Sequence, residues 1–414
     1  MGFPSPWVAV LLDAPIDPVD GLRALAAQLE QLGHSPTITR EGWLALSGSL
    51  LARPVAAPYP TDLLTHPGAV QLPKRASAAY LEISGGGLDV DRLLLVQRTQ
   101  DGAAPSKTGR FLALERLAER LASLASLGEG VVLPVAAHRF VPWTSWPTAG
   151  AGTIFAALVT LGRSRDELST RGLRLFSVPE VGAAIAGDVD GCMRAVLDAA
   201  FEAAWQGFVP VAPQKLTAYV DRGVGEWTLA PVASEGLWVT DRGGDPSSFA
   251  LRASIAKLVG SHLFDDSEGK PEDTPVALFG STERRLASTL ELHRVPREKG
   301  PVELVAFSPR LSRHATYALR TVAAVLRADP DALDEYHRIA IPPLEVAGIA
   351  GVVLWPSGSV PLRGAHVSLL EAFPITPAEL ARFRAGEQGA WMDEVEQQNA
   401  FSSLQARWCS RAQR

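Results

Sequence analysis

The residues of this chain that could do chemistry are its histidines, its paired acids, its two cysteines and a few serines. A metal site of the zincin type needs two histidines one helical turn apart with a glutamate between them, so that both imidazoles face one metal ion. The histidines of this chain form no such pair. They are His34, His66, His138, His262, His293, His314, His337 and His366. The spacing therefore predicts histidines that line strands or lie at the surface.

The sequence also lacks the motifs of serine hydrolases and of nucleotide-phosphate-binding loops. A serine hydrolase places its nucleophile in a Gly-x-Ser-x-Gly turn, and the sequence around Ser49 and Ser359 does not fit that pattern. No Gly-x-x-x-x-Gly-Lys-Ser/Thr loop for a nucleotide phosphate is present. The glycine triplet at 85–87 follows a strand-like run, but no helix cap comes after it, so we expect a turn there.

Structural roles account for the remaining polar residues and the cysteines. Paired acids such as Asp329 and Asp331 stand in predicted loops or at helix starts, where carboxylates cap exposed N–H groups. Cys192 lies in a predicted helix, where a small buried side chain is expected, and Cys409 lies beside Trp408 near the end of the sequence. We therefore predict no catalytic residue, no cofactor and no bound metal.

Composition and charge narrow the class of protein. Of 414 residues, 47% are hydrophobic and 20% are charged, which is typical of a folded globular chain. The net charge of −6, without any dense Lys/Arg run, argues against nucleic acid as a partner. Two cysteines are too few for a disulfide framework, so we expect a reducing compartment, the cytoplasm.

The sequence predicts no segment that enters a membrane. Asp13 and Asp17 interrupt the first apolar run, which therefore does not resemble a signal peptide. Residues 140–162 carry no charge, but Pro142 and Pro147 interrupt them. A spanning helix needs about 20 mainly apolar residues in succession. We expect no membrane partner.

Helical and strand-like patterns alternate along the chain. The apolar spacing predicts helices over residues 17–33, 110–127, 190–206, 248–263 and 313–327. Strand-like runs lie between them, among them 7–12 and the pair STLELHRVP and PVELVAFSPR. This mixture predicts an α+β fold with two mixed α/β domains, each a largely antiparallel sheet with packed helices. We place the domains at residues 1–210 and 211–414.

The sharpest helix start lies near the C-terminal end of the sequence. Thr376 is the expected N-cap, Pro377 occupies the first helical position, and Glu379 completes a Thr-x-x-Glu capping box. A strand-like run precedes this helix. A further helical pattern follows it and contains Trp391 and Val395.

This strand-plus-helix segment, VSLLEAFPITPAELARFRAG, resembles the C-terminal signature of suppressor-of-fused-like domains. The order LELHRVP, VELVAFSP, GVVLWPSG and EAFPIT extends the resemblance over about residues 250–395. About residues 5–210 resemble an uncharacterised bacterial domain family, through LLDAPI, AAPYP, GEGVVLP and TRGLRLFSVPEV. That family brings no known catalytic residues. Bacterial suppressor-of-fused-like proteins are associated with polymorphic toxin systems, so the resemblance implies an immunity protein that binds and neutralises a toxin.

A protein of that kind needs surface anchors. Exposed tryptophans contribute strongly to interfaces, and loops display recognition residues. We therefore predict Trp143 and Trp146, in a Pro-rich loop, and Trp391 as interface residues. Asp265 and Asp266 open an acidic run that is expected at the surface, where it would complement a basic partner.

We thus expect a non-enzymatic protein that covers the active surface of a cognate toxin. Two alternatives remain open. One is an enzyme or small-ligand-binding protein whose pocket is built from the histidines and acids of the C-terminal half. The other is an adaptor whose halves bind different proteins. The sequence predicts neither the oligomeric state nor a separate ligand for the N-terminal domain.

Overall fold

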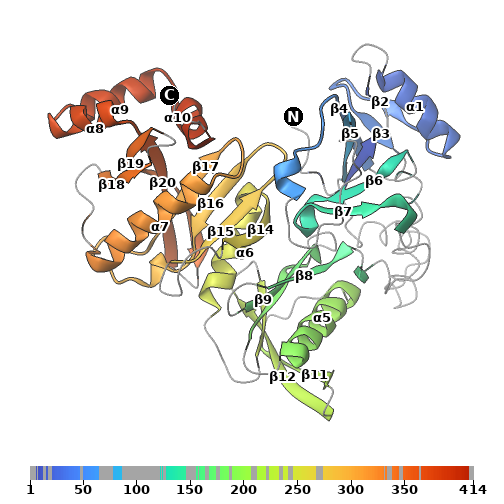
Figure 1. Cartoon of the computed structure of the whole chain (residues 1–414). Helices are drawn as coiled ribbons and strands as arrows, with labels where there is room; N and C mark the ends of the chain where they lie inside the picture. The colour runs from blue at the N-terminus through green and yellow to red at the C-terminus, as the bar shows by residue number, and fades with distance from the viewer. Residues whose placement is uncertain are drawn as a thin grey trace. The chain divides into compact units, whose positions relative to one another are not determined.

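A computed structural model gives the arrangement of the helices and strands (Figure 1). The residues that it describes are 6, 8–12, 15–16, 21–46, 50–64, 78–85, 122, 124, 127–145, 155–156, 158–163, 167–173, 178–185, 189–206, 212–220, 223–232, 236–240, 246–266, 274–330, 332, 338–344, 348–362 and 365–409. The chain forms two compact units, Met1–Pro246 (unit 1) and Ser247–Arg414 (unit 2). Helices pack on largely antiparallel sheets in both units, which confirms the predicted α+β class.

The first sheet of unit 1 has the strand order β2-β3-β4-β5-β1-β6-β7, with antiparallel neighbours throughout. Its strands are β1 (Val8–Leu12), β2 (Thr37–Ile38), β3 (Leu44–Leu46), β4 (Leu50–Val55), β5 (Ala79–Gly85), β6 (Gly128–Leu133) and β7 (Arg139–Pro142). The inner strand β1 is buried along its whole length, as its apolar run predicts. Helix α1 (Gly21–Gln31) contributes Leu25 and Leu29 to the core beside it.

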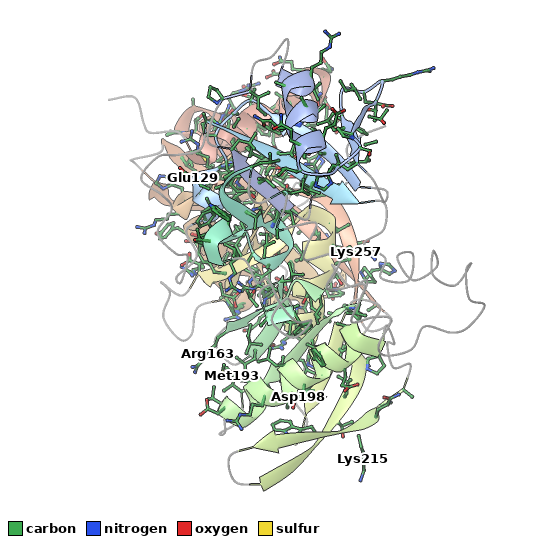
Figure 2. All side chains as sticks on the ribbon, turned by 90° about the vertical axis from the view of Figure 1, so that its right-hand side faces the viewer. Glu129, Arg163, Met193, Asp198, Lys215 and Lys257 are labelled. Carbon is green, nitrogen blue, oxygen red and sulfur yellow. The ribbon has the colours of Figure 1, made fainter. Side chains whose placement is uncertain are left out.

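The second sheet of unit 1 has the order β11-β12-β13-β10-β9-β8. Its strands are β8 (Thr160–Arg163), β9 (Glu167–Arg171), β10 (Glu180–Ala184), β11 (Gln214–Val220), β12 (Gly223–Val232) and β13 (Gly236–Thr240). Helix α5 (Val189–Gln206) packs on it and buries Cys192, as expected of that residue. Met193 and Asp198 lie on the exposed side of α5 (Figure 2). Unit 1 therefore contains two sheets, which share one hydrophobic core.

The two units divide at Pro246 and Ser247, whereas the sequence analysis places the domain boundary at 210/211. The physical reason is strand pairing. β11, β12 and β13 form antiparallel pairs in succession, and β13 pairs in parallel with β10. Residues 214–240 thus complete a sheet that begins before residue 210.

Unit 2 is built on one sheet with the order β14-β15-β16-β17-β20-β19-β18, in which only β17 and β20 are parallel. The strands are β14 (Ser261–Asp266), β15 (Val276–Gly280), β16 (Arg285–Thr289), β17 (Val302–Ser308), β18 (Arg338–Leu344), β19 (Ile349–Leu362) and β20 (Ala365–Ile375). The helices are α6 (Ser247–Val259), α7 (Arg313–Ala328), α8 (Pro377–Arg384), α9 (Gln388–Gln397) and α10 (Phe401–Ala406).

Alternation along β19 and β20 directs side chains to two different cores. Val352, Leu354 and Ala372 pack in the core that contains α7. Val353 and Phe373 pack with residues of α8, α9 and α10. Unit 2 is therefore a sheet with helices on both faces, and the C-terminal helices are an integral part of it.

The predicted helices agree with the structure to different degrees. The helix expected at 313–327 is α7, capped by Ser312, whose side chain accepts a hydrogen bond from the Ala315 amide. The helix expected at 248–263 is too long, because α6 ends at Val259 and Ser261 already begins β14. Gly260 lies between them at φ +139°, a conformation that favours glycine. Most of the helix expected at 110–127 lies outside the described residues.

The predicted capping box at α8 is confirmed. The Thr376 side chain accepts from the Glu379 amide, and the Glu379 carboxylate accepts from the Thr376 amide at 2.8 Å. The same carboxylate also accepts hydrogen bonds from Arg407 at 2.7 Å and from the indole N–H of Trp391 at 3.1 Å. Glu379 thus ties α8 to α9 and to the segment after α10. None of the helices among the described residues has the length and apolar character needed to cross a membrane.

Glu379→Gln is expected to lower the free energy of unfolding by about 2 kcal/mol, because it weakens a helix cap and removes the anion that Arg407 contacts. Burial alone would raise the pKa of Glu379, but the hydrogen bonds from Arg407, Thr376 and Trp391 outweigh burial and lower it. The stabilisation is therefore present above pH 4.5, the ordinary value for this group, and is lost as the pH falls further.

Chemical denaturation at neutral and acidic pH measures this effect. Glu387→Gln is the matched control, because Glu387 pairs with Arg382 at the surface and exposed pairs contribute little. Equal losses of stability in the two variants would contradict the role assigned to Glu379.

Candidate functional site

Of the predicted interface residues, Trp143 lies at the surface. β7 ends at Pro142, and the chain then enters the short helix η3 (Trp143–Ser145). β7 is the last strand of its sheet among the described residues, so Trp143 stands at the end of an edge strand. The residue is 49% exposed. Trp146, its predicted companion, lies outside the described residues.

Asp265 and Asp266 are turned toward basic side chains of unit 2. Asp265 accepts hydrogen bonds from His262 at 2.7 Å and from Arg252 of α6 at 3.1 Å. Asp266 forms an ion pair with Arg320 of α7 at 3.3 Å. Both aspartate side chains are only 14% exposed. The expectation of a solvated acidic surface is therefore corrected for these two residues: they end strand β14, and their charges are compensated within the unit.

Trp391 is buried and only 4% exposed. Its ring packs edge-to-face on Phe383, with ring centroids 5.1 Å apart, and its indole N–H is bonded to Glu379. The structure thus places Trp391 in the core beneath the C-terminal helices, not on a displayed surface. The cause is helical periodicity, which directs Trp391 and Val395 of α9 to the same inner face.

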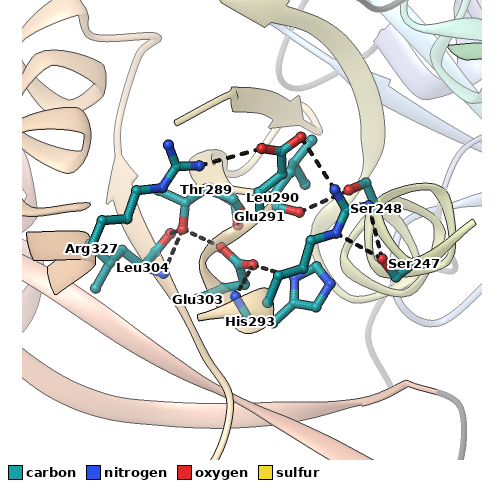
Figure 3. A network of polar contacts seen from close by, with 11 residues as sticks. Ser247, Ser248, Thr289, Leu290, Glu291, His293, Glu303, Leu304 and Arg327 are labelled. Atoms are coloured by element: carbon teal, nitrogen blue, oxygen red, sulfur yellow. Dashed lines mark hydrogen bonds and ion pairs between the residues drawn. The ribbon is translucent and has the colours of Figure 1, made fainter. Parts of the chain in front are cut away.

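A buried carboxylate organises the polar centre of unit 2 (Figure 3). Glu303 of β17 is fully buried. It accepts hydrogen bonds from the Thr289 hydroxyl, from the backbone amide of His293 at 2.9 Å and from Nδ1 of His293 at 2.6 Å. The Thr289 hydroxyl in turn accepts from the Leu304 amide at 2.9 Å, at the end of the β16–β17 pair. Burying a charge without such donors would cost several kcal/mol.

His293 has one satisfied and one unsatisfied ring nitrogen. Its side chain is 6% exposed. Because a carboxylate only accepts hydrogen bonds, the contact with Glu303 places a ring proton on Nδ1, so that the neutral form of the ring carries its lone pair on Nε2. Among the residues that the structure describes, Nε2 has no hydrogen-bond partner. An imidazole oriented in this way by a carboxylate resembles the base of nucleophilic enzymes.

The segment around His293 also borders the first turn of α6. The Ser248 hydroxyl donates to the Leu290 carbonyl at 3.1 Å, and Arg294 donates to the Ser247 hydroxyl at 3.0 Å. Figure 3 shows these contacts beside the Glu303 pair. Residues 292–294 form a 3-10 turn, η5, so the sequence expectation of a strand through LELHRVP is wrong in this part. β16 ends at Thr289, and there the Thr289 hydroxyl, in place of a backbone carbonyl, accepts the hydrogen bond from the Leu304 amide of β17.

Glu371 of β20 is a second buried acid with a different environment. It accepts hydrogen bonds from Gln405 of α10 at 2.8 Å and from Ser357 of β19 at 3.4 Å. Burial raises the pKa of Glu371 to about 7, while these two bonds and the charge of Arg284 act in the opposite direction. The carboxyl group therefore holds its proton over most of the acidic range and joins α10 to the sheet as a largely neutral group.

Unit 1 has buried polar contacts of its own. The Tyr59 hydroxyl lies 2.5 Å from Nδ1 of His138. Glu82 of β5 is fully buried and bonded to Arg53 of β4 at 2.7 Å. Across the described ranges of both units, no group of three or more His, Cys, Asp and Glu side chains is arranged to hold a metal ion.

Sequence reasoning did not single out Glu303, His293 or Glu371. The available signal was a single acid in an otherwise apolar strand, as in VELVAFS and in VSLLEAFPI. A charged residue in a run buried on both faces must find donors or stay protonated. The spacing of histidines along the chain carried no information, because the carboxylate that orients His293 comes from the next strand.

Neither the models of known protein families nor the curated proteins match this sequence. The resemblance of residues 250–395 to suppressor-of-fused-like domains, and that of residues 5–210 to an uncharacterised bacterial domain, therefore remain predictions from short motifs.

Glu371→Gln is expected to change the pH dependence of stability. The folded-state pKa of about 7 exceeds the ordinary value of 4.5, so the free energy of unfolding falls as the pH rises between these values. The loss amounts to about 3 kcal/mol at most. Glutamine cannot ionise, so the variant should gain about 2–3 kcal/mol relative to the parent chain between about pH 5 and pH 8.

Denaturant titrations at both pH values measure this gain. Glu396→Gln, a change of the same chemistry at an exposed position of α9, is the control and should show no such pH dependence. A constant difference between Glu371→Gln and the parent chain at the two pH values would contradict the buried-acid account.

Proposed function

We propose that this chain acts by binding another protein through unit 1. The observation that carries the proposal is Trp143, a large aromatic residue that is half exposed at the end of β7, the last strand of its sheet in the part of the chain that the structure describes. Tryptophan is enriched among the residues that dominate binding energy, because its ring buries a large area at a small cost in side-chain entropy. An edge strand adds backbone groups that a partner can pair with.

The distribution of charge supports a basic partner for unit 1. Of 45 acidic and 39 basic residues, 25 and 20 lie in residues 1–246, whereas 20 and 19 lie in residues 247–414. The acidic excess of the chain is therefore concentrated in unit 1. Complementary charge speeds association and selects between partners more than it adds affinity.

We propose further that the partner is a cognate toxin of a bacterial polymorphic toxin system. On this hypothesis the chain is an immunity protein that works in the cytoplasm and covers a basic active surface of the toxin. The motifs that resemble suppressor-of-fused-like domains support this partner class. An adaptor that binds two different proteins is the alternative with the same kind of anchor.

Coexpression with the products of neighbouring genes tests the proposal. One product should form a stoichiometric complex with this chain and should arrest growth when it is expressed alone. Trp143→Ala should weaken the complex about 30-fold, as expected for a central anchor. Tyr317→Ala, which removes an aromatic residue that is 45% exposed on α7 of unit 2, is the matched control and should leave affinity unchanged.

Equal effects of the two substitutions would contradict binding through unit 1. The absence of any complex with a growth-arresting neighbour would contradict the immunity hypothesis as a whole.

A second candidate function is catalysis or small-ligand binding at His293. The observation that favours it is the oriented imidazole with an unsatisfied Nε2 among the described residues. Its test is reactivity toward diethyl pyrocarbonate, mapped by mass spectrometry on the native protein. Modification of His293 at a rate similar to that of exposed His366 would support a reachable site. Protection of His293 until the protein unfolds would assign the pair a structural role.

A further inference from the structure

β6 contains an irregularity beside Trp143. In the pairing of β1 with β6, Leu11 lies opposite Gly130 and Leu12 opposite Gly128, so Glu129 is an extra residue in a β-bulge. A bulge leaves one residue unpaired and redirects its side chain. Gly128 allows the close approach of β1, because a Cβ there would lie 1.7 Å from the Leu11 carbonyl oxygen, and Gly130 allows that of β7, because a Cβ there would lie 2.5 Å from the Val141 carbonyl oxygen.

The same strand brings Glu129 next to Trp143. β6 pairs with β7 in an antiparallel register that ends with Gly130 opposite Pro142. Beyond this pair β7 ends and Trp143 begins η3, which is in contact with β6. Glu129 and the half-exposed Trp143 therefore lie near each other in the fold, beside the last strand of the sheet among the described residues.

One oxygen of the Glu129 carboxylate lacks a donor among the described residues. Its Oε2 atom is buried and has no hydrogen-bond partner among the residues that the structure describes, although the residue as a whole is partly exposed. A buried acceptor without a partner is costly, and the cost is relieved when a donor arrives. An indole face attracts cations through its quadrupole. Both groups would be satisfied by one guanidinium or ammonium group.

We infer that Glu129 and Trp143 form a recognition site for an arginine or lysine side chain on an extended segment of a partner protein that aligns along β7. This inference rests on the proposed function, since it names the chemistry that the partner presents to the same edge. The acidic excess of unit 1 favours the same sign of charge.

A peptide titration of the full-length chain tests the site. The probe is the extended peptide acetyl-Thr-Val-Arg-Val-Thr-amide, and its control replaces arginine by citrulline, which has the same shape without the charge. The readout is the ¹⁵N-indole resonance of Trp143, assigned by its absence in Trp143→Phe. The arginine peptide should bind about tenfold more tightly than the citrulline peptide.

Two variants separate the site from general electrostatics. Glu129→Gln should lower the affinity for the arginine peptide part of the way toward that of the citrulline peptide, because the Trp143 ring still attracts the cation, and should leave the affinity for the citrulline peptide unchanged. Glu41→Gln removes an exposed acid from the same unit, between β2 and β3, and should change neither affinity. Thermal melts of both variants establish that they are folded.

Equal affinities for the two peptides, no shift of the Trp143 resonance, or equal losses in Glu129→Gln and Glu41→Gln would each overturn the inference. A different result distinguishes failure of the cation site from failure of the proposed function. A growth-arresting partner whose affinity falls in Trp143→Ala but not in Glu129→Gln would refute the cation site and leave protein binding through unit 1 in place.

Discussion

A carboxylate that leaves water must find hydrogen-bond donors or keep its proton, and this constraint governs the polar interior of both units. Glu303 meets it with three donors from Thr289 and His293. Glu379 meets it with Arg407, Trp391 and the first turn of α8. Glu371 meets it by a pKa near neutrality. Glu303 joins η5 to the β16–β17 pair, whereas Glu371 and Glu379 join elements that are distant in sequence and so help to hold the C-terminal helices on the sheet.

Glu129 departs from this pattern. One of its oxygens is buried without a partner in the described part of the chain, at a bulge beside an exposed tryptophan. Elsewhere the acids that we first assigned to a binding surface, Asp265 and Asp266, are compensated by basic residues of their own unit. Among these acids of the described chain, the oxygen without a donor therefore belongs to Glu129 of the first sheet in unit 1, and not to Asp265 or Asp266 of unit 2.

The sequence predicts local structure well and contacts across the sheets poorly. The capping box of α8 and the extent of α7 follow from rules that involve neighbouring residues only, and both are observed. The burial of Trp391 depends on Phe383 and Glu379 of α8. The composition of the chain does not predict that α8 packs beside α9 and provides these two partners. The Glu303–His293 pair and the contact of β6 with η3, which brings Glu129 near Trp143, likewise depend on strand pairing, which a single sequence does not reveal.

Hydrogen–deuterium exchange of the complex with a coexpressed partner tests the central claim most directly. If the chain acts by protein binding through unit 1, the partner will slow exchange of the backbone amides in β7 and η3, residues 139–145. The amides of α7 in unit 2 will exchange as they do in the free chain. Protection confined to unit 2, with residues 139–145 exchanging at the free rate in a tight complex, would contradict the account.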